Sequence, residues 1–131
     1  MGRPASRKSQ KRYHALVALG LVLLGMLTLW WCLGRQMDWT HWLVCWLVAI
    51  NVVAFGYYGY DKSQARSSGG RVPEVVLHGL SAGGGSIGSF CAMQVFRHKT
   101  IKGSFRLLFW CIVLLHLALL AWAIKLVWWS N

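Results

Sequence analysis

The sequence predicts an all-α membrane protein: a helical bundle with three full spans and one further hydrophobic segment. Hydrophobic residues make up 56% of the 131 residues and charged residues only 13%, which is far from the composition of a soluble globular domain. The apolar residues form four runs of about twenty, the length at which a helix crosses the hydrocarbon core of a bilayer. A net charge of +11 would suggest nucleic-acid binding in a soluble chain. Because the charges lie in clusters between the apolar runs, membrane topology explains them better.

Residues 1–13 form a basic tail before the first apolar run. The tail holds five Lys and Arg residues and no acid, and it has no periodicity. Basic segments next to spans stay on the cytoplasmic side, so we expect the N-terminus in the cytoplasm. Residues 14–33 then form a first span, about 30 Å long as a helix and too long for a signal peptide.

A second run at residues 39–60 follows a short turn and predicts an antiparallel helical hairpin. We assign residues 14–52 to this transmembrane hairpin, residues 53–106 to a central region and residues 107–131 to a last transmembrane helix. Tryptophans gather at the turn of the hairpin, as an aromatic belt at one interface would place them. The central region has seven of the fourteen Lys and Arg residues and two of the three acids.

The third apolar run, at residues 75–96, is rich in glycine and either spans or re-enters the membrane. Pro73 and Glu74 predict a helix start just before it. If the run spans, eight basic residues lie inside and five outside; if it dips in and returns, twelve lie inside and one outside. The greater asymmetry favours the re-entrant form, with the triple glycine as the place to turn.

The glycines of this run are expected to pack helices closely. A dinucleotide-binding loop formally fits residues 83–88, but it would need a preceding strand and a later acid that the sequence lacks. Small residues four apart instead let helices approach in lipid. The predicted packing positions are Gly79, Gly83, Gly84, Gly85 and Gly88.

Several charged residues are candidates for binding. Glu74 and His78 lie one helical turn apart, and ionisable groups at membrane depth are costly enough to suggest function. Two ligands are too few for a metal site, so we expect no metal, and nothing indicates a cofactor. The basic cluster of Arg97, Lys99 and Lys102 is either a topology signal or a site for phosphate or an anionic headgroup.

Together these residues resemble a known family. The motifs are Tyr58-Gly59-Tyr60-Asp61-Lys62, Arg71-Val72-Pro73-Glu74, Leu77-His78, Gly84-Gly85-Ser86-Ile87-Gly88 and Arg97-His98-Lys99-Thr100. In this order they resemble the YsdA-like family of small bacterial membrane proteins, a domain of unknown function, over roughly residues 53–106. The resemblance implies a bacterial inner-membrane location and no assigned activity. It marks a polar signature of Asp61, Lys62, Glu74, His78, Arg97, His98 and Lys99. Some members carry a cold-shock domain, which has no counterpart in the short basic tail, so RNA binding is not implied.

We therefore predict a binding or accessory protein that engages an anionic lipid headgroup or a membrane partner at the cytoplasmic face. A subunit of an oligomeric transporter or channel is the alternative, with ionisable residues lining a path between helices. A lipid-directed enzyme ranks third, because no catalytic motif is present. The candidate binding residues are Asp61, Lys62, Glu74, His78, Arg97, His98, Lys99 and Lys102.

Overall fold

The computed structural model describes residues 7–33, 38–67, 71–97 and 103–130, and the described regular structure is entirely helical. In order, the elements are α1 (Arg7–Leu33), α2 (Trp39–Arg66), α3 (Glu74–Leu80), the wide turn η1 (Ser81–Gly85), α4 (Ser86–Phe96) and α5 (Gly103–Ser130). Four helical segments are long and apolar enough to cross a membrane: Ser9–Leu33, Trp39–Arg66, Glu74–Phe96 and Gly103–Trp129. The predicted fold class is therefore confirmed.

The third of these segments folds back on itself. Gly84, in η1, has φ 115° and ψ −3°, a conformation outside the helical region that glycine adopts without steric cost. The backbone N–H of Val72, just before α3, donates to the carboxylate of Asp61 at 2.9 Å, near the end of α2. At the other end of the segment, the ring of Phe96 lies against Gly59. Both ends of the segment therefore lie beside the same end of α2.

The turn of this helical hairpin lies further along α2. Gly83 faces Ile50, and Gly84 faces Leu47. From Leu47 to Asp61 is about 21 Å of helix, so the hairpin tip reaches a little past half of a 30 Å hydrocarbon core. The backbone therefore follows the folded-back path that the re-entrant alternative predicts.

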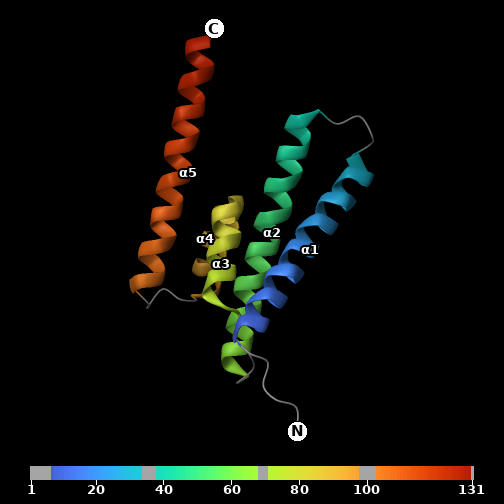
Figure 1. Cartoon of the computed structure of the whole chain (residues 1–131), viewed down its shortest axis with the longest axis vertical. Coiled ribbons are helices and arrows are strands. Elements are labelled where there is room, and N and C mark those ends of the chain that lie inside the picture. The colour runs from blue at the N-terminus through green and yellow to red at the C-terminus, as the bar shows by residue number, and fades with distance from the viewer. Residues whose placement is uncertain (1–6, 34–37, 68–70, 98–102, 131) are drawn as a thin grey trace.

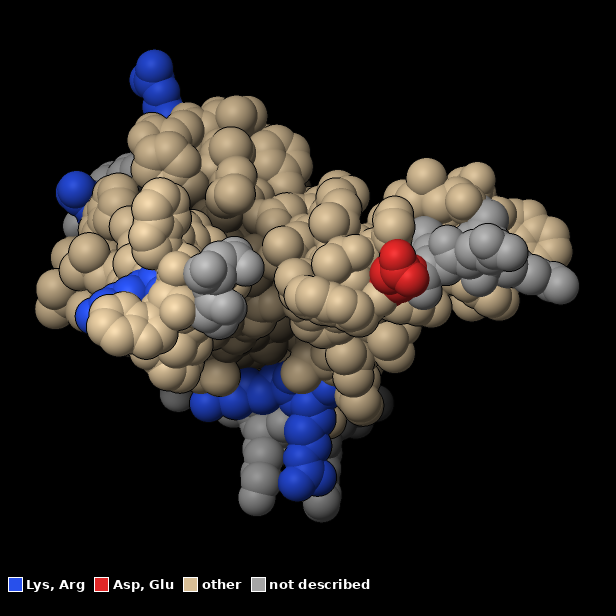
Figure 2. Space-filling model, turned by 90° about the horizontal axis from the view of Figure 1, so that it is seen from above, with Lys and Arg blue, Asp and Glu red and all other residues tan. Residues whose placement is uncertain are grey.

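The paths of the long helices agree with this arrangement (Figure 1). Helix α1 begins, α2 ends, α3 begins and α5 begins at one end of the bundle, whereas α5 finishes at the other. We call the first the basic end; among its charged residues are Lys11, Arg12, Lys62, Arg66 and Arg97. The opposite end presents a mostly uncharged face with a hollow near its middle (Figure 2). Three long helices and one hairpin place the start of α1 and the end of α5 at opposite ends.

Three helices extend beyond the predicted spans into charged sequence. Helix α1 already begins at Arg7, inside the basic tail of residues 1–13, α2 continues to Arg66 and α5 begins at Gly103. Lys, Arg, Gln and Ala are good helix formers, and a helix need not end where the hydrocarbon ends. The extension of α2 matters most, because it places Lys62 and Arg66 one turn apart on an ordered helix.

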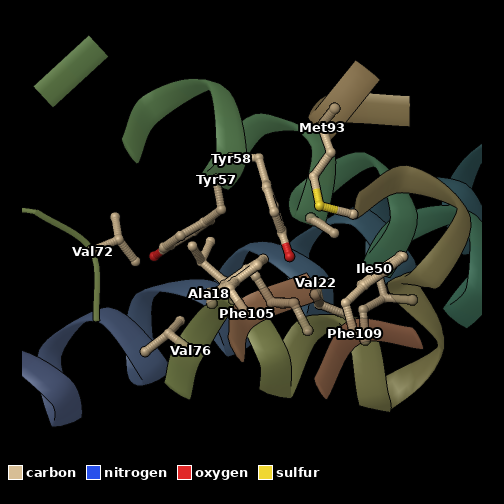
Figure 3. Close-up of a cluster of buried hydrophobic side chains, with 14 of the residues drawn as sticks. Ala18, Val22, Ile50, Tyr57, Tyr58, Val72, Val76, Met93, Phe105 and Phe109 are labelled. Carbon is tan, nitrogen blue, oxygen red and sulfur yellow. The ribbon is translucent and has the colours of Figure 1, made fainter. Parts of the chain in front are cut away.

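The core lies between α2, the hairpin and the first turns of α5 (Figure 3). Tyr58 is fully buried, and its ring meets that of Phe105 edge to face with centroids 6.2 Å apart. Met93 of α4 and Leu77 of α3 complete this layer, and α1 adds Ala18. In contrast, α5 is exposed on all sides from residue 117 to residue 129.

Candidate functional site

The turn of the hairpin is held by side chains of α2. A broken helix leaves carbonyl groups without helical partners, and in lipid these groups must be satisfied by protein. The indole N–H of Trp46 donates to the carbonyl of Gly83 at 2.9 Å, and the Asn51 amide donates to the carbonyl of Gly84 at 3.0 Å. The Asn51 side-chain oxygen also accepts the N–H of Gly88 at 2.6 Å, near the start of α4. Asn51 therefore bonds to both sides of the turn.

Helix α5 contributes a third contact through His116. Its Nε2 lies 3.0 Å from the carbonyl of Ala82, which only accepts, so Nε2 carries the hydrogen. Its Nδ1 lies 2.9 Å from the hydroxyl of Ser86, which also lies 2.9 Å from the carbonyl of Ser81. Three consecutive carbonyls of the turn thus have side-chain donors from two spanning helices.

Sequence reasoning missed these donors. Trp46 and Asn51 lie inside the predicted second span and His116 inside the predicted last helix, and sequence reasoning assigned none of them a role. A signal did exist, because Asn51 and His116 are polar residues inside otherwise apolar runs, and such residues usually have a partner within the protein.

Two buried serines join the arms of the hairpin. Ser81 and Ser89 are fully buried, and their hydroxyl oxygens are hydrogen-bonded at 2.7 Å. The Ser81 hydroxyl also reaches the carbonyl of Leu77 at 3.0 Å, and the Tyr58 hydroxyl lies 3.4 Å away. These polar groups pair inside the core instead of facing lipid.

The predicted packing glycines divide into two groups. A Cβ on Gly88 would clash with the backbone carbonyl of Asn51, so α4 and α2 are in backbone contact there. A Cβ on Gly85 would lie 2.6 Å from the carbonyl oxygen of Leu80 and 3.0 Å from the Cβ of Ala54, and Gly83 and Gly84 face side chains of α2. At Gly79, in contrast, a Cβ would meet nothing within 4 Å, so the structure shows no close helix contact at this position.

The acidic part of the signature lies at the junction of α2 and α3. Asp61 is 0% exposed, and the bond from Val72 ties the end of α2 to the start of α3. Glu74 is half-buried in the first turn of α3. The ring of His78 lies on that of Phe105, with centroids 4.2 Å apart and planes inclined by 33°.

The basic part of the signature lines a separate pocket of about 520 Å³ at the basic end. We call it the cationic pocket; it is lined by Gly59, Lys62, Ser63 and Arg66 of α2 and by Val95, Phe96 and Arg97 at the end of α4. Among the residues that the structure describes, three cations line it and no acid does. Cations at helix C-termini also complement the helix dipole, so part of this arrangement is structural.

Arg97 occupies a left-handed conformation, with φ 45° and ψ 41°, at the C-terminus of α4. Its N–H donates to the carbonyl of Met93, which completes the last turn. Glycine is the usual residue at such a helix end, because a side chain in this conformation costs about 1–2 kcal/mol. The conformation ends α4 beside Lys62 and Arg66.

The structure thus brings together Lys62 and Arg97 and adds Arg66, which was not predicted for the site. Asp61, Glu74 and His78 do not line this pocket. His98, Lys99 and Lys102 lie outside the described residues.

The comparisons with known proteins give a family but no activity. A model of a family described as protein of unknown function (DUF1294) matches residues 51–105, from within α2 through the hairpin to the start of α5. The chain is 36% identical over 64 residues to the uncharacterized protein YsdA of Bacillus subtilis (strain 168), across 49% of this chain and 72% of that protein. No solved structure matches the chain. The resemblance seen in the sequence motifs is therefore confirmed, and this multi-pass membrane protein belongs to the DUF1294 family.

Proposed function

We propose that the protein binds the headgroup of an anionic phospholipid in the cationic pocket and acts as a binding or accessory protein of the membrane. The observation that carries this proposal is the convergence of Lys62, Arg66 and Arg97 on one pocket that no acid lines. Two different helices supply these cations, and helix α4 ends in a strained residue at this place.

The chemistry of the pocket suits a lipid phosphate. Arginine can form two parallel hydrogen bonds to phosphate oxygens, whereas lysine adds a compact charge. The lining of Val95 and Phe96 offers apolar contact to the part of the lipid next to the phosphate. Backbone strain of the kind found at Arg97 tends to occur at functional sites, and here it directs a cation toward the pocket.

We propose the bacterial inner membrane as the location, with the basic end in the cytoplasm. The relative from Bacillus subtilis supports a bacterial membrane, and the concentration of basic residues at one end supports the orientation. Anionic lipid at that surface attracts basic residues by about 1 kcal/mol each, so the pocket would lie where its ligand is available.

An oligomeric transporter subunit and a membrane protein partner are the alternatives, and a lipid-directed enzyme ranks below them. A transporter needs polar groups that face a path, yet Trp46, Asn51 and His116 each bond to the hairpin backbone. This use of the intramembrane polar groups favours binding over transport.

Native mass spectrometry of the full-length protein in detergent, with added phosphatidylglycerol or phosphatidylcholine, tests the proposal. We expect preferential retention of phosphatidylglycerol. Substitutions Lys62→Gln, Arg66→Gln and Arg97→Gln should each weaken one lipid adduct about fivefold, which corresponds to about 1 kcal/mol per lost cation.

Arg71→Gln at the same end and Lys125→Gln on the far half of α5 remove the same charge outside the pocket and serve as controls. Equal retention by the pocket variants and these controls would contradict the proposal. The same spectra report the oligomeric state. An oligomer that retains lipid equally well with and without the pocket substitutions would favour the transporter.

A further inference from the structure

A second groove lies on the opposite side of α2, where the hairpin faces α1. It has a volume of about 440 Å³ and is lined by small and apolar residues, including Ala15 and Leu19 of α1 and Gly79 of α3. Trp46 of α2 also lines it, near the tip of the hairpin. At the basic end its lining includes Lys11 and Arg12. We call this the α1–α3 groove.

We propose that the α1–α3 groove holds one acyl chain of an anionic phospholipid whose phosphate pairs with Lys11 and Arg12. The groove is apolar along its length and cationic at one end, which is the charge pattern complementary to such a lipid. Its cations come from α1, whereas those of the cationic pocket come from α2 and the end of α4, so the two sites have no residue in common.

The length of the groove matches one leaflet. Its α1 wall runs from Lys11 to Val22, a rise of about 16 Å, and half of the hydrocarbon core is about 15 Å. The groove reaches Gly83 and Trp46, where the hairpin turns. The re-entrant fold therefore creates a groove that is one acyl chain deep.

Gly79 keeps the groove open. It lines the groove, and a Cβ at this position would meet nothing within 4 Å. Lipid tails are as apolar as the groove wall, so selectivity must come from shape and from the charges at the mouth. The open position at Gly79 gives the groove its shape, and Lys11 and Arg12 supply the charges at its mouth.

A second copy of the chain fits the groove less well than a lipid does. A copy in the same membrane would bring its own basic end to the same surface, and the chain has a net charge of +11. Like charges would then meet at Lys11 and Arg12, whereas a lipid phosphate neutralises them.

Photocrosslinking locates the lipid directly. The full-length protein is reconstituted in vesicles of phosphatidylcholine with a minority of phosphatidylglycerol, part of which carries a photoreactive group in one acyl chain. We expect crosslinks on α1 and α3 residues of the groove. Gly79→Leu should remove most of them by filling the space, while Lys11→Gln and Arg12→Gln should each lower them about fivefold.

Two glycines provide matched controls, because a Cβ at either meets nothing within 4 Å and neither lines this groove. Gly20→Leu adds the same side chain elsewhere on α1, and Gly56→Leu adds it in the crevice between α1 and α2. Both should leave the groove crosslinks unchanged. If Gly79→Leu fails to fold, Ala15→Leu fills the groove from the α1 side.

Unchanged groove crosslinks in Gly79→Leu and Ala15→Leu would overturn the proposal. So would equal crosslinking by a phosphatidylcholine probe with the same photoreactive chain, or a chain-to-chain crosslink in the groove that Gly79→Leu removes. Loss of groove crosslinks with intact lipid retention by the cationic pocket would separate this site from the proposed function.

Discussion

The hairpin and helix α5 are two segments that hydropathy alone would treat alike, and they behave in opposite ways. Both Glu74–Phe96 and Gly103–Trp129 are long and apolar enough to span a membrane. Yet in the apolar 18-residue stretch of each segment, 44% of the hairpin residues are buried inside the protein, against 6% of those in α5. The hairpin turns back at Gly84, whereas α5 runs straight from one end of the bundle to the other (Figure 1).

The difference shows that hydropathy measures whether a segment can enter lipid and not which path it takes there. The hairpin owes its lower mean hydropathy, 1.2 against 2.5, to the same glycines and serines that let it turn and pack. Its broken backbone is acceptable in lipid only because Trp46, Asn51 and His116 satisfy it. Helix α5 satisfies its own backbone and needs few neighbours.

The largest loss of stability is expected when the close packing of the hairpin is disturbed by Gly88→Ala. A Cβ at Gly88 meets the carbonyl of Asn51, so α4 must move away from α2, at a cost of about 3 kcal/mol or more. Unfolding in detergent and denaturant, followed by tryptophan fluorescence, measures the loss. Gly20→Ala is the control, because that position is open and exposed, and it should be neutral or slightly stabilising. Similar losses in both variants would mean that α4 and α2 do not touch at Gly88.

A smaller loss is expected from Asn51→Leu. The change keeps a side chain of similar size but removes the bonds to Gly84 and Gly88, at about 1 kcal/mol each in a membrane protein. The free energy of unfolding should fall by about 2 kcal/mol in the same assay. Accessibility of a thiol engineered at Ala82 in the turn should also rise, if Asn51 holds the tip in place. A stable Asn51→Leu protein with an inaccessible tip would contradict this role.

The smallest losses of stability are expected from substitutions in α5, and they should be smaller where α5 is exposed than where it contacts the hairpin. His116→Phe keeps a ring but removes the bond to Ala82, so we expect a loss of about 1 kcal/mol. Leu119→Ala, one turn further on and exposed, should change stability by less than about 0.5 kcal/mol. Equal effects at both positions would show that α5 packs against protein further along than the structure indicates.

Much of the fold was predictable from composition and spacing. Apolar runs of bilayer length predicted the spans, Pro73 and Glu74 predicted the start of α3, and the basic residues around the glycine-rich run favoured a hairpin. The order of short motifs around Asp61, Glu74 and Arg97 predicted the family. These features depend on neighbouring residues or on how charge is distributed across a membrane, and both can be read along the chain.

The pairings between distant residues were not predictable. Asn51 has its partners at Gly84 and Gly88, and His116 has its partners at Ala82 and Ser86. Gly79 and Gly88 look equivalent in the sequence, yet one faces open space and the other touches backbone. Lys62 and Arg66 follow the predicted second span, which ends at residue 60, so their place on the same helix was missed.

The sequence by itself determined that four segments are apolar enough to enter a membrane, where α3 begins and that most basic residues lie outside these segments, because transfer into lipid depends on composition. Only the tertiary structure decided which side of each helix meets another. That choice depends on packing and hydrogen bonds between residues far apart in the chain. It separates the buried Asp61 from the cationic pocket and leaves the α1–α3 groove open beside Gly79.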